Sequence, residues 1–399
     1  MKIIPIVLLA IIPAFVACKD TEIKSIEREE IFSLNIGLME DQLALYNLVG
    51  QGTGKKPGFA MRDGFFYIAD GTVGKIVSYN SYGDLLFMIY NEETNPAPVS
   101  LRINNDENKH VTRWAYTYPL REPGEITVDS RKHIFVEERL PHERHRFDPD
   151  NRVLLDRIVL HFDADGRFVE YLGQEGIGGS PFPRINGLYT SQNDELAVVC
   201  RLPSAWNVYW YSSGTLLYLI QLKNHSVPVP SEWPDVYSSV DTVVAATDAR
   251  RVYIKVDYYR ETIDESTNMR TGHEPYGSII WILNAEDGLY IDSVRLPFYE
   301  TAATESNRPD TFRLLYSMLG AVRNGRFFLY YPEDNGFSIM VVNANIHENR
   351  RGFIEVDSNT FHYNVFNLSY EGILSAMAVD DWKVSMLWWR TDRFFGISQ

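Results

Sequence analysis

The sequence predicts an all-β fold, a six-bladed β-propeller, on three observations. Aromatic residues make up 13% of the 399-residue chain, led by 24 Tyr and 21 Phe, and such residues favour pleated strands. A unit of four short strands, separated by Asp, Gly and Ser turns, recurs along the chain, and a repeat of tens of residues is typical of propellers and solenoids. The final unit lacks strands that the N-terminal part of the chain can supply.

The first 17 residues have the pattern of an export signal. Lys2 is followed by an apolar run that ends at Val16. This run is shorter than the roughly 20 residues that cross a membrane, and a small residue follows it, as at a cleavage site. We therefore expect residues 1–17 to be a signal peptide.

The ending Phe15-Val16-Ala17-Cys18 resembles a lipobox, in a relaxed form similar to those of spirochaetes. The resemblance implies cleavage before Cys18 by signal peptidase II and attachment of lipid, such as palmitate, to that cysteine. Residues 18–29 would then be the lipidated cysteine and a polar tether. The protein is thus expected to be exported and lipid-anchored to a bacterial membrane, facing the periplasm or the surface. The alternative is an ordinary cleaved signal in which Cys18 is incidental.

Charge and cysteine content narrow the class of partner. The formal net charge is −15, and an acidic protein repels phosphate backbones, which disfavours nucleic acid as a partner. The other cysteine, Cys200, ends the run Leu-Ala-Val-Val-Cys, which predicts a buried strand with the thiol as a small apolar group. We therefore expect packing, without disulfide bonds, to hold the fold together.

The clearest repeat covers residues 57–90, where turns that contain Gly separate four short strands. A second copy begins at Pro123-Gly124. The unit resembles an NHL repeat, which implies a β-propeller; NHL propellers include scaffolds and enzymes, so the resemblance leaves the function open. The resembling residues are Pro57-Gly58, Phe66-Tyr67-Ile68-Ala69-Asp70, Lys75-Ile76-Val77-Ser78-Tyr79 and the Gly83-Asp84 turn.

Later units keep the turns but depart from this pattern. The third begins near Ile185, the fourth near Asp241 and the fifth near Leu319. In the sixth unit, residues 373–379 and 383–389 give two strands, and we expect residues 30–36 and 42–48 to supply the other two. This closure removes open sheet edges from the ring and places residues 30–399 in one six-bladed β-propeller. A β-sandwich also has short, evenly spaced strands and is the alternative fold.

The predicted connections are long on one face of the ring only. Connections from the second to the third strand of a blade, and from one blade to the next, share a face, and all the long ones belong to it. Long loops in a compact domain tend to carry function, so this face is predicted to engage a protein or peptide partner of the cell envelope. The long connections are 91–120, 137–156, 223–240, 257–277 and 297–313.

Aromatic and Arg side chains in these loops are the candidate partner-binding residues, because both types anchor interfaces. The alternative is that the rings pack beneath the loops and keep them ordered. The candidates are Trp114, Tyr116, Tyr118, Arg144, Arg146, Trp233, Tyr237, Tyr258 and Tyr259.

The sequence offers little for catalysis or for a cofactor. His142 and His145 lie in one loop of alternating acids and bases, which favours a solvated loop over a metal site. The innermost strands are predicted to give the axis an apolar lining, which argues against an axial metal site. The expected lining residues are Phe59, Ala60, Ile126, Val128, Gly187, Leu188, Val243, Val244, Ala321, Val322, Ala376 and Met377.

These observations predict a membrane-anchored propeller that binds or scaffolds a partner in the envelope, with no cofactor and no assigned catalytic residue. One alternative is a metal-assisted lyase or lactonase, similar to known six-bladed propeller enzymes, with a site at the axis. In that case His142, His145 or a loop carboxylate would be the ligands. A third hypothesis is carbohydrate binding by the loop aromatics.

Overall fold

The structure, a computed structural model, covers most of the predicted propeller. It describes residues 23–45, 56–103, 113–173, 180–264, 266–267, 269–300, 313–345 and 348–397. The predicted signal peptide and Cys18 lie outside the described residues. Within those ranges, none of the helices has both the length and the apolar character needed to cross a membrane.

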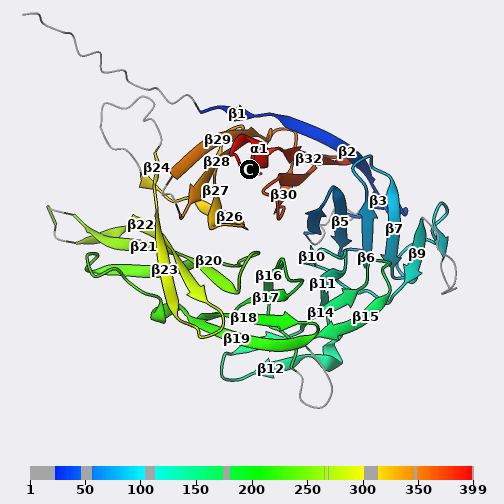
Figure 1. Cartoon of the computed structure of the whole chain (residues 1–399), viewed down its shortest axis with the longest axis horizontal. Coiled ribbons are helices and arrows are strands. Elements are labelled where there is room, and N and C mark those ends of the chain that lie inside the picture. Colours follow the sequence, from blue (N-terminus) through cyan, green and yellow to red (C-terminus); the bar gives the residue numbers. More distant parts are fainter. Residues whose placement is uncertain are drawn as a thin grey trace, which may run out of the picture.

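Six sheets stand around a common axis, which confirms the predicted six-bladed β-propeller (Figure 1). Each blade has one innermost strand, and these six strands contact one another in chain order all round the axis. They are β4 (Gly58–Arg62), β10 (Ile126–Val128), β16 (Ile185–Thr190), β20 (Val236–Ala245), β26 (Ser317–Val322) and β30 (Tyr363–Leu368).

Blades one to five each continue outward with three more antiparallel strands. In blades one and two these are β5 (Phe65–Asp70), β6 (Lys75–Tyr79), β7 (Leu85–Tyr90), β11 (Ile134–Arg139), β14 (Arg157–Phe162) and β15 (Phe168–Leu172). In blades three and four they are β17 (Leu196–Arg201), β18 (Ala205–Ser212), β19 (Thr215–Lys223), β21 (Arg251–Ile263), β22 (Arg270–Asn284) and β23 (Tyr290–Leu296). In blade five they are β27 (Arg326–Glu333), β28 (Gly336–Asn343) and β29 (Glu348–Glu355).

N-terminal strands close blade six, as predicted, but only one of them completes its set of four antiparallel strands. Its other strands, β30, β31 (Leu374–Val379) and β32 (Lys383–Trp389), all come from the C-terminal part of the chain, and β2 (Arg28–Ile36) is added outside β32. Residues 373–379 are therefore not innermost. Of the predicted strand 42–48, only β3 (Gln42–Leu43) is a strand among the described residues, and it runs parallel to β2.

The propeller also begins earlier than the predicted boundary at residue 30. β1 (Ser25–Ile26) pairs parallel with β29 of blade five, and β2 starts two residues later at Arg28. Ile26 is buried against blade five. The end of the predicted tether is therefore part of the folded ring.

Three blades have their outer edges partly covered by further strands of the same chain, which in blades five and six pair with two residues of the outer strand. β1 covers β29 of blade five, and β3 covers β2 of blade six. In blade one, β9 (Trp114–Thr117) pairs parallel with β7, and β8 (Arg102–Ile103) pairs with β9. Among the described residues, no strand pairs with the outer edges of β15, β19 or β23. We call blades one, five and six sealed, and blades two, three and four open.

The open blades expose large apolar side chains on their outer strands. The corresponding strands of the sealed blades, β2, β7 and β29, expose none. The exposed side chains are Phe168, Val169 and Tyr171 of β15, Leu216, Leu217 and Leu219 of β19, and Ile291 of β23.

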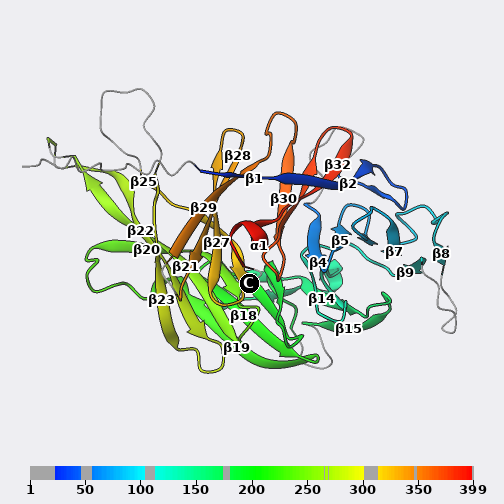
Figure 2. The ribbon, with the colours of Figure 1, turned by 45° about the horizontal axis from the view of Figure 1, so that its top comes forward.

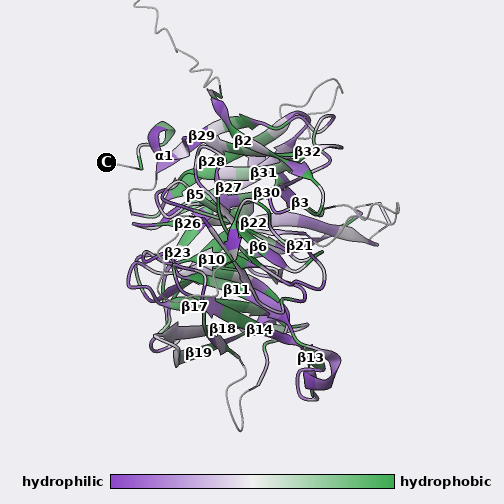
Figure 3. Cartoon of the chain, turned by 90° about the vertical axis from the view of Figure 1, so that its right-hand side faces the viewer, coloured by the Kyte–Doolittle hydropathy of each residue, from purple (hydrophilic) through white to green (hydrophobic). Residues whose placement is uncertain are grey.

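The hydrophobic core is divided into six clusters, one between each pair of neighbouring blades. Side chains alternate between the two faces of a strand, so that each blade buries both of its faces. Figure 3 shows apolar residues on the interior strands and hydrophilic residues on the outer turns. Trp389 is fully buried between blades five and six. Cys200 is buried and unpaired on β17, as predicted.

The remaining short elements lie in the connections. In blade two, η1 (His142–Arg144) and the hairpin of β12 (Arg146–Asp148) and β13 (Val153–Leu155) lie between β11 and β14. η2 (Asn224–Ser226) precedes β20, β24 (Tyr299–Glu300) pairs with β25 (Arg313–Leu314), and α1 (Thr391–Phe394) follows β32. The predicted loop 257–277 is mostly strand, because β21 and β22 stay paired out to Ile263 and Arg270.

Candidate functional site

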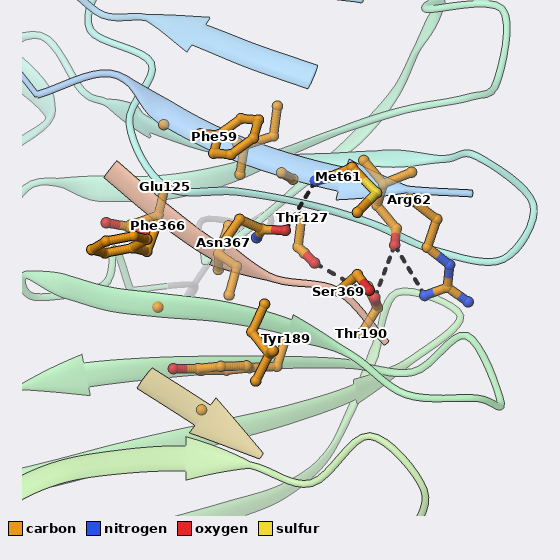
Figure 4. A pocket seen from close by; sticks show the side chains of 18 of the residues that line it. Phe59, Met61, Arg62, Glu125, Thr127, Tyr189, Thr190, Phe366, Asn367 and Ser369 are labelled. Carbon is orange, nitrogen blue, oxygen red and sulfur yellow. Dashed lines mark hydrogen bonds between the residues drawn. The ribbon is translucent and has the colours of Figure 1, made fainter. Parts of the chain in front are cut away.

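A cavity of about 220 Å³ lies on the axis, inside the ring of innermost strands (Figure 4). Its wall comes from β4, β10, β16, β26, β30 and the residues next to them. Blade four contributes only Thr247, which follows β20. Pockets for drug-sized molecules begin at roughly 300 Å³, so this cavity suits a smaller molecule.

The predicted apolar lining is only partly correct. The cavity wall does include Phe59, Ala60, Ile126, Val128, Gly187, Leu188 and Ala321, but it does not include Val243, Val244, Val322, Ala376 or Met377. Ala376 and Met377 lie on β31, the second strand of blade six. Charged and polar side chains that the sequence did not indicate also line the cavity, among them Arg62, Glu125, Asn186 and Asn367.

Glu125 lies at the end of the cavity where the innermost strands begin, which we call the roof. The close approach of two glycines brings β10 against β4 here, since a Cβ at Gly58 would lie 1.9 Å from the carbonyl oxygen of Gly124. Burial raises the pKa of the Glu125 carboxyl group, against the attraction of Lys56 and Arg184. Among the described residues, no hydrogen bond or ion pair reaches this carboxylate.

The opposite end of the cavity, the floor, is crossed by side chains from facing blades. The Tyr370 hydroxyl of blade six donates to Oε1 of Gln192 in blade three at 3.4 Å. The backbone N–H of Gln192 donates to the carbonyl oxygen of Thr247 at 2.7 Å. The Arg62 guanidinium lies 5.1 Å from the centre of the Tyr370 ring, and its Nη1 donates to the carbonyl oxygen of Val128 at 3.5 Å.

Hydroxyl groups surround the lower part of the cavity. Thr190 Oγ1 donates to the carbonyl oxygen of Val128 at 2.9 Å, and Thr127 Oγ1 lies 3.5 Å from Thr190 Oγ1. Ser369 Oγ accepts a hydrogen bond from the backbone N–H of Ile373 at 3.0 Å, which leaves its own hydrogen able to donate. The floor is therefore rich in hydrogen-bond donors.

The second candidate surface is the outer end of blade four, which projects beyond the ring (Figure 2). It comprises residues 236–240, 257–263 and 270–277, and we call it the blade-four arm. β23 pairs with β22 only from Ser278 onward. The arm therefore has an open strand edge along β22 in the described structure.

Exposed aromatic and charged side chains interact across the arm. Tyr237 is 52% exposed, and its hydroxyl donates to Glu261 Oε1 at 2.9 Å. Arg270 pairs with the same carboxylate at 3.0 Å. The Tyr237 ring lies edge-on to His273, with 5.3 Å between the ring centres. These contacts order the surface of the arm without burying it.

Four of the predicted partner-binding residues lie on or beneath the arm. Tyr237 is exposed, while Trp233 and Tyr259 are partly buried. Tyr258 is buried, since its hydroxyl donates to the carbonyl oxygen of Pro228 and accepts from Trp281 Nε1. Tyr258 therefore supports the arm from inside, and its prediction as a contact residue is wrong.

The predicted residues of the first long connection lie on the outer side of blade one. Trp114 is buried and stacks on Phe87, with ring centres 4.4 Å apart. Tyr116 packs against Trp114 at 4.8 Å, and Tyr118 stacks on Phe168 at 5.2 Å. Trp114 keeps the connection ordered and does not present its ring to a partner, which corrects its prediction as a contact residue.

Arg144 and Arg146 lie in the excursion of blade two, away from the arm (Figure 1). Both are exposed. Arg144 lies 5.9 Å from the centre of the Tyr171 ring, and Arg146 Nη1 donates to Ser180 Oγ at 3.2 Å. The structure therefore does not bring the nine predicted residues into one site.

The metal-assisted alternative finds no ligand set in the described part of the chain. His142 and His145 lie close together, with 4.7 Å between ring centres, and His145 Nε2 donates to the carbonyl oxygen of Leu140 at 2.8 Å. Across the described ranges, no three or more His, Cys, Asp or Glu side chains are grouped so that they could hold a metal ion.

Comparison with known proteins gives similarity at the level of fold alone. No family model and no curated protein matches the chain. The chain is similar to a luciferin-regenerating enzyme, with a TM-score of 0.35, 10% identity, and 84% of this chain and 90% of that one covered. It is also similar to the WD40 domain of Toxoplasma gondii coronin, with a TM-score of 0.39, 9% identity, and coverage of 93% and 87%. The Dos1 propeller has a TM-score of 0.38 and 8% identity, with coverage of 92% and 95%.

Identities this low carry no inference about activity. The resemblance to NHL repeats stays a prediction from blades one and two. The chain is a six-bladed β-propeller, and its function has to be inferred from its own side chains.

Proposed function

We propose that the protein is a lipid-anchored binding module of the bacterial cell envelope, in which the blade-four arm engages a protein or peptide partner. Propellers commonly serve as scaffolds for protein interaction. The observation that carries the proposal is the arm, which combines an open strand edge with exposed aromatic and charged side chains.

The chemistry of the arm favours an extended segment as the bound element. A free strand edge offers backbone N–H and C=O groups that a partner strand can pair with, and neighbouring side chains then give specificity. The rings of Tyr237 on β20 and His273 on β22 pack edge to face across the arm. The Arg260 guanidinium lies 3.8 Å from the centre of the Tyr276 ring. Tyr and Arg are the types that anchor protein interfaces.

The lipid anchor is the second part of the proposal. β1 begins at Ser25, so a lipid on Cys18 would be joined to the ring by a few residues only. Such a segment spans at most about 25 Å when fully extended. The ring would then stay close to the membrane surface, where its partners would be other envelope proteins.

Site-specific photocrosslinking tests the arm. A photoreactive phenylalanine analogue replaces Tyr237, and the same analogue replaces Tyr82 as the matched control, because Tyr82 is 87% exposed on a turn of blade one. We expect a discrete crosslinked product in envelope preparations from position 237 and none from position 82. Equal products from both positions, or none from 237, would reject the arm as the partner site.

Mass spectrometry of the mature N-terminus tests the anchor separately. We expect a diacylated or triacylated Cys18 peptide, and we expect Cys18→Ala to release the protein from the membrane fraction. An unmodified N-terminus upstream or downstream of Cys18 would contradict the anchor and leave the arm proposal standing.

A further inference from the structure

Two donors at the floor of the axial cavity lack the partners that buried groups normally have. Arg62 Nε and Thr247 Oγ1 are both buried without a hydrogen-bond partner among the described residues. Both residues line the same cavity. Buried polar groups in folded proteins nearly always have a partner, so these two donors are available to a ligand at the floor.

The chemistry of the floor suits a carboxylate. Arg62 forms no ion pair within the described residues, and a planar guanidinium is the side chain that best matches carboxylate geometry. The nearby acidic side chains have other partners, since Asp63 pairs with Lys132 and Asp129 with Arg131. Ser369 adds a further hydroxyl donor.

The roof of the same cavity carries a carboxylate, that of Glu125, and Lys56, which attracts it, also lines the wall. The Glu125 carboxylate lines the cavity without a hydrogen bond from the described residues, and the Asn186 amide in the same wall also makes none. A buried carboxylate without donors is best satisfied by an ammonium group, which brings three. Figure 4 shows Glu125 and Arg62 at opposite ends of the cavity.

The separation of the two ends sets the length of the ligand. Glu125 lies near the start of β4, beside Gly58, and Arg62 is the last residue of that strand. Four residues of strand span roughly 13 Å, and both side chains shorten the gap. A linear molecule of several carbons with charged ends fits this spacing. Its zero net charge also avoids repulsion by a chain of net charge −15.

We propose that the axial cavity binds a small zwitterion, with its carboxylate held by Arg62, Thr247 and Ser369 at the floor and its ammonium group held by Glu125 at the roof. This site is independent of the blade-four arm.

Calorimetric titration of the purified protein with a series of ω-amino carboxylates tests the proposal. The probes are 4-aminobutyrate, 6-aminohexanoate and 8-aminooctanoate, with hexanoate and hexylamine as molecules that carry one charged end only. We expect at least one amino carboxylate to bind, and the single-ended molecules to bind at least about tenfold more weakly, because each charge-assisted contact contributes to affinity.

Variants at the two ends separate binding from structural damage. Arg62→Gln should weaken the amino carboxylate and hexanoate at least about tenfold and leave hexylamine unchanged. Glu125→Gln should weaken the amino carboxylate and hexylamine but not hexanoate. Lys132→Gln is the matched control, since it removes the same charge near Arg62 from a side chain outside the cavity. A misfolded variant would lose all ligands together, which thermal melting reports.

Three outcomes would overturn the proposal. The first is that no amino carboxylate of the series binds the wild-type protein. The second is that Arg62→Gln binds as tightly as the wild type. The third is that Lys132→Gln weakens binding as much as Arg62→Gln does.

Discussion

The sealed and open halves of the ring differ in whether a further strand pairs with the outer edge of each blade. In blades one, five and six, short parallel strands from the chain's own connections and N-terminal part cover the edge. In blades two, three and four, the edge is open, and apolar side chains such as Leu219 and Ile291 are exposed beside it. The blades of both halves are built from four antiparallel strands, and the halves differ in whether a further strand pairs with the outermost one.

The difference shows where the chain protects itself against intermolecular pairing. An open edge is a template for another strand, and the sealed half contains the junction between the two ends of the chain, where a gap would open the whole ring. In the open half, where no strand of the described residues covers the edge, irregular pairing is the protection that remains. The outer strand pair of each open blade has a register shift, at Phe162, Tyr211 and Leu283, as the outer pairs of blades one and six also have, and such bulges twist an edge away from flat pairing.

The largest expected effect is at the closing blade. Trp389→Ala removes a fully buried ring between blades five and six, and it should lower the free energy of unfolding by about 3–5 kcal/mol. Trp382→Ala is the control in the same blade, because Trp382 is 81% exposed, and it should change stability by less than about 0.5 kcal/mol. Urea unfolding measures both. Similar losses for the two variants would show that the closing blade is not held by this interface.

A matched pair of outer-strand substitutions compares the halves directly. Ile354→Ala, on the covered strand β29, should cost about 2–5 kcal/mol because Ile354 is fully buried in the same core cluster as Ile26 of β1. Leu219→Ala, on the open strand β19, should cost less than about 0.5 kcal/mol because Leu219 is 46% exposed. Thermal unfolding of both variants provides the readout. Equal costs would contradict the distinction between sealed and open edges.

A buried acid of the open half should make stability depend on pH. Burial raises the pKa of Glu137 from 4.5 to about 7, against the attraction of Arg157. The folded state therefore keeps this proton longer than the unfolded state, and the resulting stability is present below pH 4.5 and lost as the pH rises through about 7. Relative to Glu137→Gln, the wild type should lose up to about 3 kcal/mol across this window. Unfolding free energies at a series of pH values test it, and a constant difference between the two proteins would refute it.

Most of the propeller could be predicted from turn chemistry. Glycine turns such as Asp63-Gly64 and Asn324-Gly325 have the positive φ that a tight hairpin requires, and the strands on either side of them were predicted correctly. The innermost strand of blade six was missed because Tyr363–Leu368 carries two Asn and lacks a clear apolar alternation. One of these two residues, Asn367, has a clear structural role, because its Oδ1 accepts a hydrogen bond from the backbone N–H of Met61 in the next blade.

The sites were harder to predict than the fold. Arg62 is the last residue of one predicted innermost strand, and Glu125 directly precedes another. A charged residue at the end of an innermost strand was the available sign of an axial site. In the linear sequence, Arg62 was part of a hairpin turn and Glu125 part of a repeat motif, so that their shared cavity was not visible. Burial of loop aromatics was equally hidden, because Tyr237 and Tyr258 have the same residue type and opposite exposure.

The pairing of β2 with β32 has a consequence for biosynthesis. Arg28 lies opposite Trp389. The first long strand to be synthesised, β2, therefore cannot pair in its sheet until β32, one of the last strands, has also been synthesised. A polypeptide whose synthesis stops before β32 leaves β2 without its antiparallel partner and the ring open between blades six and one. Closure of the ring therefore becomes possible only after nearly the whole of the propeller has been synthesised.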